Sequence, residues 1–163
     1  MAAAITSKAA RRSRKHWAQA SDAIDRAESV RLRAMSLVNE DAAVYADVIQ
    51  ASRIGHDAGE DPDLAGGILQ TALSAAAEVQ LEVAELADQV ARLAAGAAVS
   101  GNPNLRGDAV VAALLAAAAA QGATILVAIN LQAHPADARI EQSRALAAHA
   151  RARARASMSA AAQ

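Results

Sequence analysis

Asp41 and Tyr45 form the pair of side chains in this chain best suited to acid or base chemistry. They stand four residues apart in a segment that should be helical, so the two side chains can meet on one face. We expect Asp41 to lie beside an apolar stripe, where partial withdrawal from water raises the proton affinity of a carboxylate. Judged by spacing alone, a solvated aspartate on the surface of a helix bundle is the commoner case.

Two other carboxylates are candidates for binding a polar group. Asp108 follows a polar loop, residues 101 to 107, and stands where a helix N-cap belongs, so that it could accept from unpaired amides of the first turn. Glu82 is a candidate substrate-binding residue, but it belongs to an acidic row that is more often simply solvated. The row consists of Glu78, Glu82, Glu85 and Asp88.

Several kinds of site are excluded or disfavoured by residue type and spacing. The chain has no cysteine, which excludes disulfides and thiol catalysis. Its four histidines show no paired ligand spacing, so we expect no metal site. Basic ends flank an acidic middle, and basic arms can bind nucleic acid or anionic lipid. With one Trp and one Tyr there is no aromatic interleaving for base stacking, so we expect no nucleic-acid partner.

The elements that must position these residues are all helical. The 163 residues include 50 alanines and no alternating β-branched runs, which predicts an all-α fold with a single domain, residues 1 to 158, and a disordered tail, residues 159 to 163. We expect an up-and-down bundle of about four long helices joined by short connections. Helical spacing and turn residues predict one long helix over residues 7 to 53 that could break near its middle, and further helices over 63 to 99, 108 to 132 and 136 to 158.

The helix over residues 108 to 132 carries no charge beyond Asp108, so most of it should be hidden from solvent. It is long enough to span a bilayer, but alanine and Gln121 at its centre favour insertion poorly. Two long amphipathic helices elsewhere need a partner for their apolar faces. We therefore expect this helix to be the central, uncharged member of a soluble bundle, with no membrane partner.

Four segments, taken in order and at their separations, resemble one protein family. They are LVNEDAAVYADVIQASR at 37 to 53, AAAEVQLEVAEL at 75 to 86, GNPNLRGDAVVAALL at 101 to 115, and GATILVAINL at 122 to 131. The chain is thereby identified as similar to the cyclodeaminase/cyclohydrolase family. That family includes the C-terminal domain of formiminotransferase-cyclodeaminase and the bacterial methenyltetrahydrofolate cyclohydrolases.

The resemblance implies a cytoplasmic helical bundle that forms a dimer or larger homo-oligomer and acts on a tetrahydrofolate derivative without a metal. The implied reaction is closure of formimino-tetrahydrofolate to the methenyl form with loss of ammonia, or hydrolysis of the methenyl form. Both need proton transfer at nitrogen. The implied site residues are Asp41 as acid or base, Tyr45 beside it, Asn102, Asn104 and Asp108 at the cleft rim, and Asn130 on the central helix.

The chain also departs from the family pattern. It lacks the Pro-Gly-Gly-Gly-Ser loop and first apolar helix with which the family begins, and MAAAITSK resembles the end of that helix. Gln80, Gly107 and Leu126 stand where the family has Pro, Ser and Asn. We therefore expect weak or no turnover, and a non-catalytic oligomeric scaffold is the alternative. An uncovered apolar groove would favour homo-oligomers.

Overall fold

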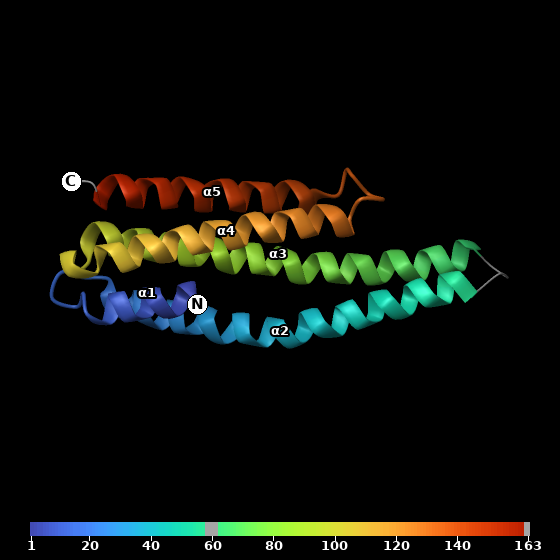
Figure 1. The fold of residues 1–163 in the computed structure, drawn as a ribbon, viewed down its shortest axis with the longest axis horizontal. Coiled ribbons are helices and arrows are strands. Elements are labelled where there is room, and N and C mark those ends of the chain that lie inside the picture. The colour runs from blue at the N-terminus through green and yellow to red at the C-terminus, as the bar shows by residue number, and fades with distance from the viewer. Residues whose placement is uncertain (58–61, 162–163) are drawn as a thin grey trace.

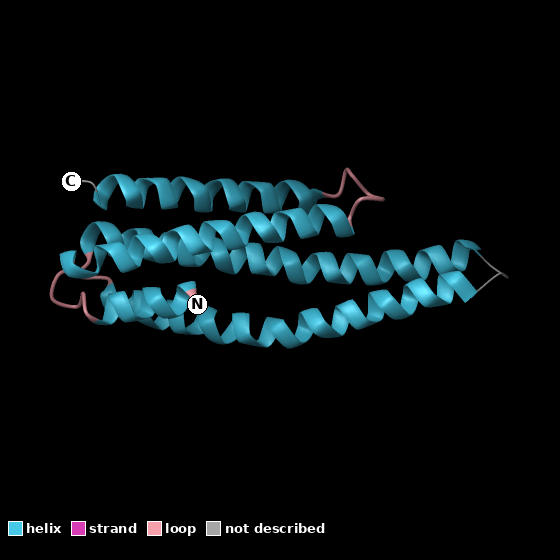
Figure 2. Ribbon diagram, in the orientation of Figure 1, coloured by secondary structure: helices cyan, strands magenta, loops and turns pink. Residues whose placement is uncertain are grey.

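The computed structural model describes residues 1–57 and 62–161, and this part of the chain is helical with short connections (Figures 1 and 2). The all-α prediction is confirmed: the four long helices follow one short one, and no strand occurs in the described ranges. The elements are α1 Ala2–Arg11, α2 Ala20–Asp57, α3 Pro62–Ser100, the 3-10 turn η1 Pro103–Leu105, α4 Arg106–Asn130 and α5 Ala138–Ala161.

The bundle is built around the pair α3 and α4. Helix α3 packs against each of the other four helices, while α4 packs against α1, α3 and α5. Helices α2 and α3 are the longest, with 38 and 39 residues, and their paired ends extend beyond the ends of α4 and α5 (Figure 1). Much of the second half of α2 is consequently covered mainly by α3.

The predicted helix over residues 7 to 53 is wrong at its start. The chain leaves α1 after Arg11, reverses through residues 12 to 19, and returns as α2, so that α1 lies alongside it (Figure 1). One local and one distant contact hold this reversal: the Ser13 hydroxyl donates to the Ala9 carbonyl at 2.8 Å and accepts from the Asn102 amide, 89 residues away, at 2.8 Å. Trp17 packs against Leu93 and the other buried side chains of its cluster.

A salt-bridged clasp fastens α1 to α2. The Ser7 hydroxyl donates to Glu28 at 2.6 Å, and Arg31 lies 2.8 Å from the same carboxylate. These hydrogen bonds, that of Ser7 foremost, lower the pKa of Glu28 from its ordinary value of 4.5 to about 2. The clasp is therefore made with the ionised form of Glu28.

Glu28→Gln should make the protein less heat-stable at pH 7, and the difference from the wild type should shrink in acid. Because the folded-state pKa of Glu28 is lower than its unfolded value, its contribution is complete above pH 4.5 and disappears as the pH falls towards 2. Thermal midpoints of both proteins between pH 7 and pH 2 measure this. A difference that stayed constant over the range would contradict it.

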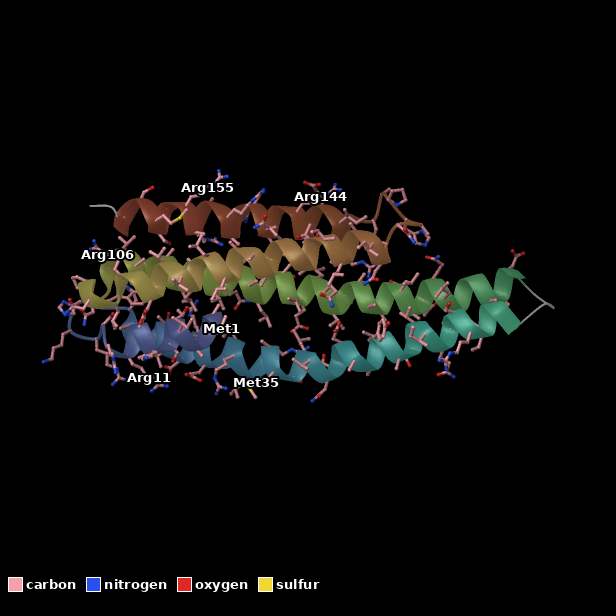
Figure 3. The ribbon with its side chains drawn as sticks, viewed as in Figure 1. Met1, Arg11, Met35, Arg106, Arg144 and Arg155 are labelled. Atoms are coloured by element: carbon pink, nitrogen blue, oxygen red, sulfur yellow. The ribbon has the colours of Figure 1, made fainter. Side chains whose placement is uncertain are left out.

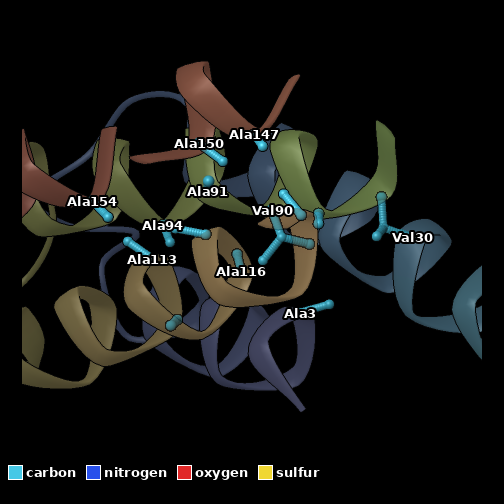
Figure 4. Close-up of a cluster of buried hydrophobic side chains, with 14 residues drawn as sticks. Ala3, Val30, Val90, Ala91, Ala94, Ala113, Ala116, Ala147, Ala150 and Ala154 are labelled. Atoms are coloured by element: carbon cyan, nitrogen blue, oxygen red, sulfur yellow. The ribbon is translucent and has the colours of Figure 1, made fainter. Parts of the chain in front are cut away.

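The core is made mainly of alanine. Its main cluster brings together fully buried Ala91 and Ala94 from α3, Ala113 and Ala116 from α4, and Ala150 from α5 (Figure 4). Small side chains allow helix axes to approach closely but give little apolar area per residue. Stability must then come from many short-range contacts along long helices.

Helix α4 is less hidden than its composition predicts. Its core face, from Ala109 to Val127, is buried, but its outer face is exposed to solvent. By length and composition residues Pro103–Asn130 could cross a membrane, yet the alanine face lies inside the main core cluster, which favours the bundle. The outer face of α4 comprises Val111, Leu114, Ile125, Leu126 and Ile129.

The acidic row on α3 is paired, contrary to the expectation of a solvated surface. Three of its members fasten α5: Glu78 pairs with Arg139 at 3.4 Å, Glu85 accepts from Gln142 at 3.0 Å, and Asp88 accepts from Arg153. These contacts help to explain why α5 continues to Ala161, through part of the predicted disordered tail. Residues 162 and 163, and residues 58 to 61 of the predicted acidic loop, lie outside the described residues.

Candidate functional site

Asp41 lies just past the middle of α2 and is exposed, so of the two readings left open by the sequence the structure has the solvated aspartate and not the one withdrawn from water. The cause is architectural: the adjoining half of α2 is covered mainly by α3. From α3, the Gln80 side-chain amide donates to Asp41 Oδ1 at 2.6 Å. This bond fixes one carboxylate oxygen, and the described residues provide no hydrogen bond to the other.

An apolar cavity of about 340 Å³ lies next to this pair. Its walls come from the start of α1 and from α2, α3 and α4, and every lining residue is apolar. Leu37 and Val83 belong to the wall and stand about one helical turn from Asp41 and Gln80 respectively. The Asp41 carboxylate is therefore placed near the edge of an apolar hollow. Figure 3 shows Met1, another lining residue, part-way along the bundle at the beginning of α1.

Two other predicted site residues lie along the same stretch of the bundle. Tyr45 is one turn beyond Asp41 on α2, with 65% of its surface exposed. Asn130, at the end of α4, is half-buried. Because its neighbour Leu131 packs in one cluster with Leu81 of α3, Asn130 stands at about the same level as Gln80.

Glu82 is engaged by an arginine that the sequence analysis did not single out. Arg33 of α2 donates hydrogen bonds to both oxygens of Glu82: its Nε lies 2.5 Å from Oε1, and a terminal nitrogen lies 2.6 Å from Oε2. It also pairs with Glu40. The hydrogen bond to Glu82, followed by that to Glu40, raises the pKa of Arg33 above its already high value, and Arg33 in turn lowers the pKa of Glu40. Glu82 thus has a partner within the fold. Glu82 could bind substrate only if its hydrogen bonds to Arg33 were broken.

The structure separates Asn102, Asn104 and Asp108 from Asp41. Asn102 caps η1, since its side chain accepts from the Asn104 amide at 3.0 Å. Asp108 is exposed in the first turn of α4 and is not its cap; Leu105 holds that position, without a side-chain hydrogen bond. Twenty residues of α3 separate Gln80 from Ser100, which is roughly 30 Å of helix. In one protomer these three residues do not line the cleft beside Asp41.

Gln80 is the hydrogen-bonding neighbour of Asp41, and sequence reasoning assigned it no role. Its position in place of a family proline was visible, but its pairing with Asp41 bridges 39 residues of sequence. No helical periodicity encodes which residue of α3 stands opposite Asp41. Among the described residues no cluster of three or more histidine or carboxylate side chains is arranged to hold a metal ion.

Comparisons of the sequence and of the fold with known proteins show the family of this chain. The chain is 24% identical to formiminotetrahydrofolate cyclodeaminase from Thermotoga maritima, whose crystal structure superposes with a TM-score of 0.84 over 98% of this chain and 81% of that one. At this identity the likeness shows a shared fold. A search of curated protein sequences gave no match. The sequence model of the formiminotransferase-cyclodeaminase family matches residues 1–149. The chain therefore belongs to the formiminotransferase-cyclodeaminase family.

Proposed function

We propose that this protein is a folate-dependent one-carbon enzyme of the cyclodeaminase or cyclohydrolase type. The observation that carries the proposal is the Asp41 carboxylate, held on one oxygen by Gln80 and placed near an apolar cavity, in a chain of this family. An apolar hollow with a few convergent polar groups is the usual form of a site for a ring-containing ligand. Here it would take the ring system of a tetrahydrofolate derivative.

The reaction needs a group that moves protons. In ring closure, a substrate nitrogen attacks the formimino carbon, and its proton must be transferred as the other nitrogen departs as ammonia. In hydrolysis, water adds to the methenyl carbon and loses a proton. The open Asp41 oxygen is available for either transfer, and a carboxylate also stabilises a cationic amidine-like carbon. Tyr45 and Asn130 lie along the same stretch of the bundle and would orient the substrate.

A second candidate function is that of a non-catalytic oligomeric scaffold. Two observations favour it: Arg33 already occupies both oxygens of Glu82, and the polar residues of the loop before α4 lie roughly 30 Å of helix from Gln80. Asp41 is also exposed to solvent, and Gln80 already donates to one of its two oxygens. For these reasons we expect turnover by the purified chain to be weak.

The absorbance of methenyl-tetrahydrofolate distinguishes the two functions. Ring closure of formimino-tetrahydrofolate would make this absorbance appear, and hydrolysis would make it disappear. A rate above the spontaneous one supports the enzyme, whereas no acceleration by folded, monodisperse protein supports the scaffold. We further propose that the protein acts in the cytoplasm as a homodimer or larger homo-oligomer and requires no metal.

A further inference from the structure

A basic pocket lies between α1 and α2, on the surface of the bundle. Its volume is about 350 Å³, which is within the range of small-molecule sites. Four cationic side chains and one carboxylate line it, an excess of three positive charges. The full lining consists of Ala4, Ser7, Lys8, Arg11, Arg12, Glu28 and Arg31. Figure 3 labels Arg11 on the side of the bundle formed by α1 and α2.

Contacts within the fold already occupy the one carboxylate of this pocket. Oε1 of Glu28 accepts from Ser7 at 2.6 Å and lies 3.5 Å from Arg11, while Oε2 accepts from Arg31 at 2.8 Å. A guanidinium group has five N–H donors, so both arginines keep unused donors after these bonds. Glu28 thereby holds the two guanidinium groups in place before a ligand arrives, which lowers the entropic cost of binding.

Lys8 and Arg12 supply positive charge that the fold does not use. Both are exposed, and the described residues provide no ion pair for either. Lys8 and Arg11 stand in the last turn of α1, where cations offset the negative end of the helix dipole. That effect accounts for a cation at the helix end, but not for four cations around one pocket. These cations repel one another, and a bound anion would relieve the repulsion.

We propose that the basic pocket binds the diphosphate group of a small phosphorylated molecule. An arginine fork matches phosphate oxygens with two parallel hydrogen bonds, and a lysine contributes a point charge. A diphosphate carries several negative charges on adjacent groups, which suits the excess of positive charge on both walls. Among the described residues that line the pocket none is aromatic, so a purine or pterin ring has nothing to stack on. The group that is recognised is therefore the diphosphate itself.

The basic pocket shares a helix with the apolar cavity near Asp41. The first three residues of the chain line that cavity, and the next two turns of α1 line the basic pocket. On α2, Val30 belongs to the cavity and Arg31 to the pocket. A diphosphate that joins α1 to α2 would therefore hold the α1 wall of the cavity in place. The pocket is independent of the folate chemistry, and its test needs no turnover.

Calorimetric titration of the full chain with inorganic pyrophosphate tests the proposal. We expect a dissociation constant in the micromolar range, at least about tenfold lower than that for inorganic phosphate, because the diphosphate reaches cations on both helices. Lys8→Gln and Arg12→Gln should each raise this constant at least about tenfold, since each removes a charge-assisted hydrogen bond. Both side chains are exposed, so helix content by circular dichroism should be unchanged.

Arg14→Gln and Lys15→Gln are the matched controls. Each removes an exposed cation from the adjacent reversal of the chain, and neither residue lines the pocket. The affinity of both variants for pyrophosphate should equal that of the wild type. Equal losses in all four variants would show a general attraction of anions to a basic surface and would overturn the proposal.

Thermal unfolding provides a second readout. Pyrophosphate should raise the midpoint of the wild type, because a ligand that binds only the folded chain stabilises it, and the rise should vanish in the double variant of Lys8 and Arg12. No binding by folded wild type at pyrophosphate concentrations up to about 1 mM would overturn the proposal. So would wild-type protein that sediments with phosphatidic acid vesicles but binds no free pyrophosphate, since a lipid headgroup would then be the ligand.

Discussion

Asp41→Asn is expected to reduce turnover by a factor of about 10² to 10⁴, or to the spontaneous rate if that is reached first. The amide keeps the shape of the side chain and a hydrogen-bonding partner for Gln80, but it cannot take up a proton at neutral pH. The loss should appear in kcat, since proton transfer occurs in the chemical step. The measurement is the initial rate of change in methenyl-tetrahydrofolate absorbance.

Asp47→Asn is the matched control. It makes the same exchange on the same helix at another exposed aspartate, six residues further along α2. Its turnover should equal that of the wild type. If Asp41→Asn instead left a robust rate unchanged, Asp41 would not be the acid or base, although family membership and fold would stand. Equal losses in both variants would indicate a general effect of charge on substrate attraction.

Ala94→Leu should lower the free energy of unfolding by about 1 to 3 kcal/mol. Ala94 is fully buried in the main core cluster, where α3 meets α4, and none of the described cavities includes it. Close-packed alanines leave no space for three further carbon atoms, so helix axes must move apart. In a chain of this size each kcal/mol corresponds to about 2 to 4 °C in the midpoint of thermal unfolding.

The same exchange at an exposed alanine provides the comparison. Ala43→Leu on α2 should change stability by no more than about 0.5 kcal/mol. Calorimetry at a fixed protein concentration keeps any contribution from self-association the same for all variants. An unchanged midpoint for Ala94→Leu would show that the alanine core is looser than the packing of α3 on α4 indicates.

The family and the helical class could both be predicted from the sequence because their signals are local or depend only on order. Apolar spacing over residues 63 to 99 predicted α3, Pro62–Ser100, to within about one residue at each end. The turn residues around Pro103 and Pro135 marked the ends of α4. The resemblance rested on four segments in sequence, which the family match confirms.

The errors arose where distant segments decide the outcome. Residues 12 to 19 have no Gly or Pro, so nothing local ends the helix there; the reversal depends on Ser13 meeting Asn102, 89 residues away. From the sequence, the acidic row was expected to be solvated. In the structure, arginines of α5 pair with it. Asp108 looks like a cap, but η1 starts the helix earlier.

The candidate site likewise has one part that the sequence determines and another that depends on how the helices pack. The sequence by itself determined that Asp41 and Tyr45 share one face of a helix, because that follows from a period of 3.6 residues. Only the tertiary structure decided that Gln80 holds Asp41, that Arg33 occupies Glu82 across 49 residues of sequence, and that Asn102 lies far away. It also decided which face of α4 remains exposed. The physical reason is that helix formation depends on neighbours within a few residues, whereas the relative positions of helices depend on how their whole surfaces pack.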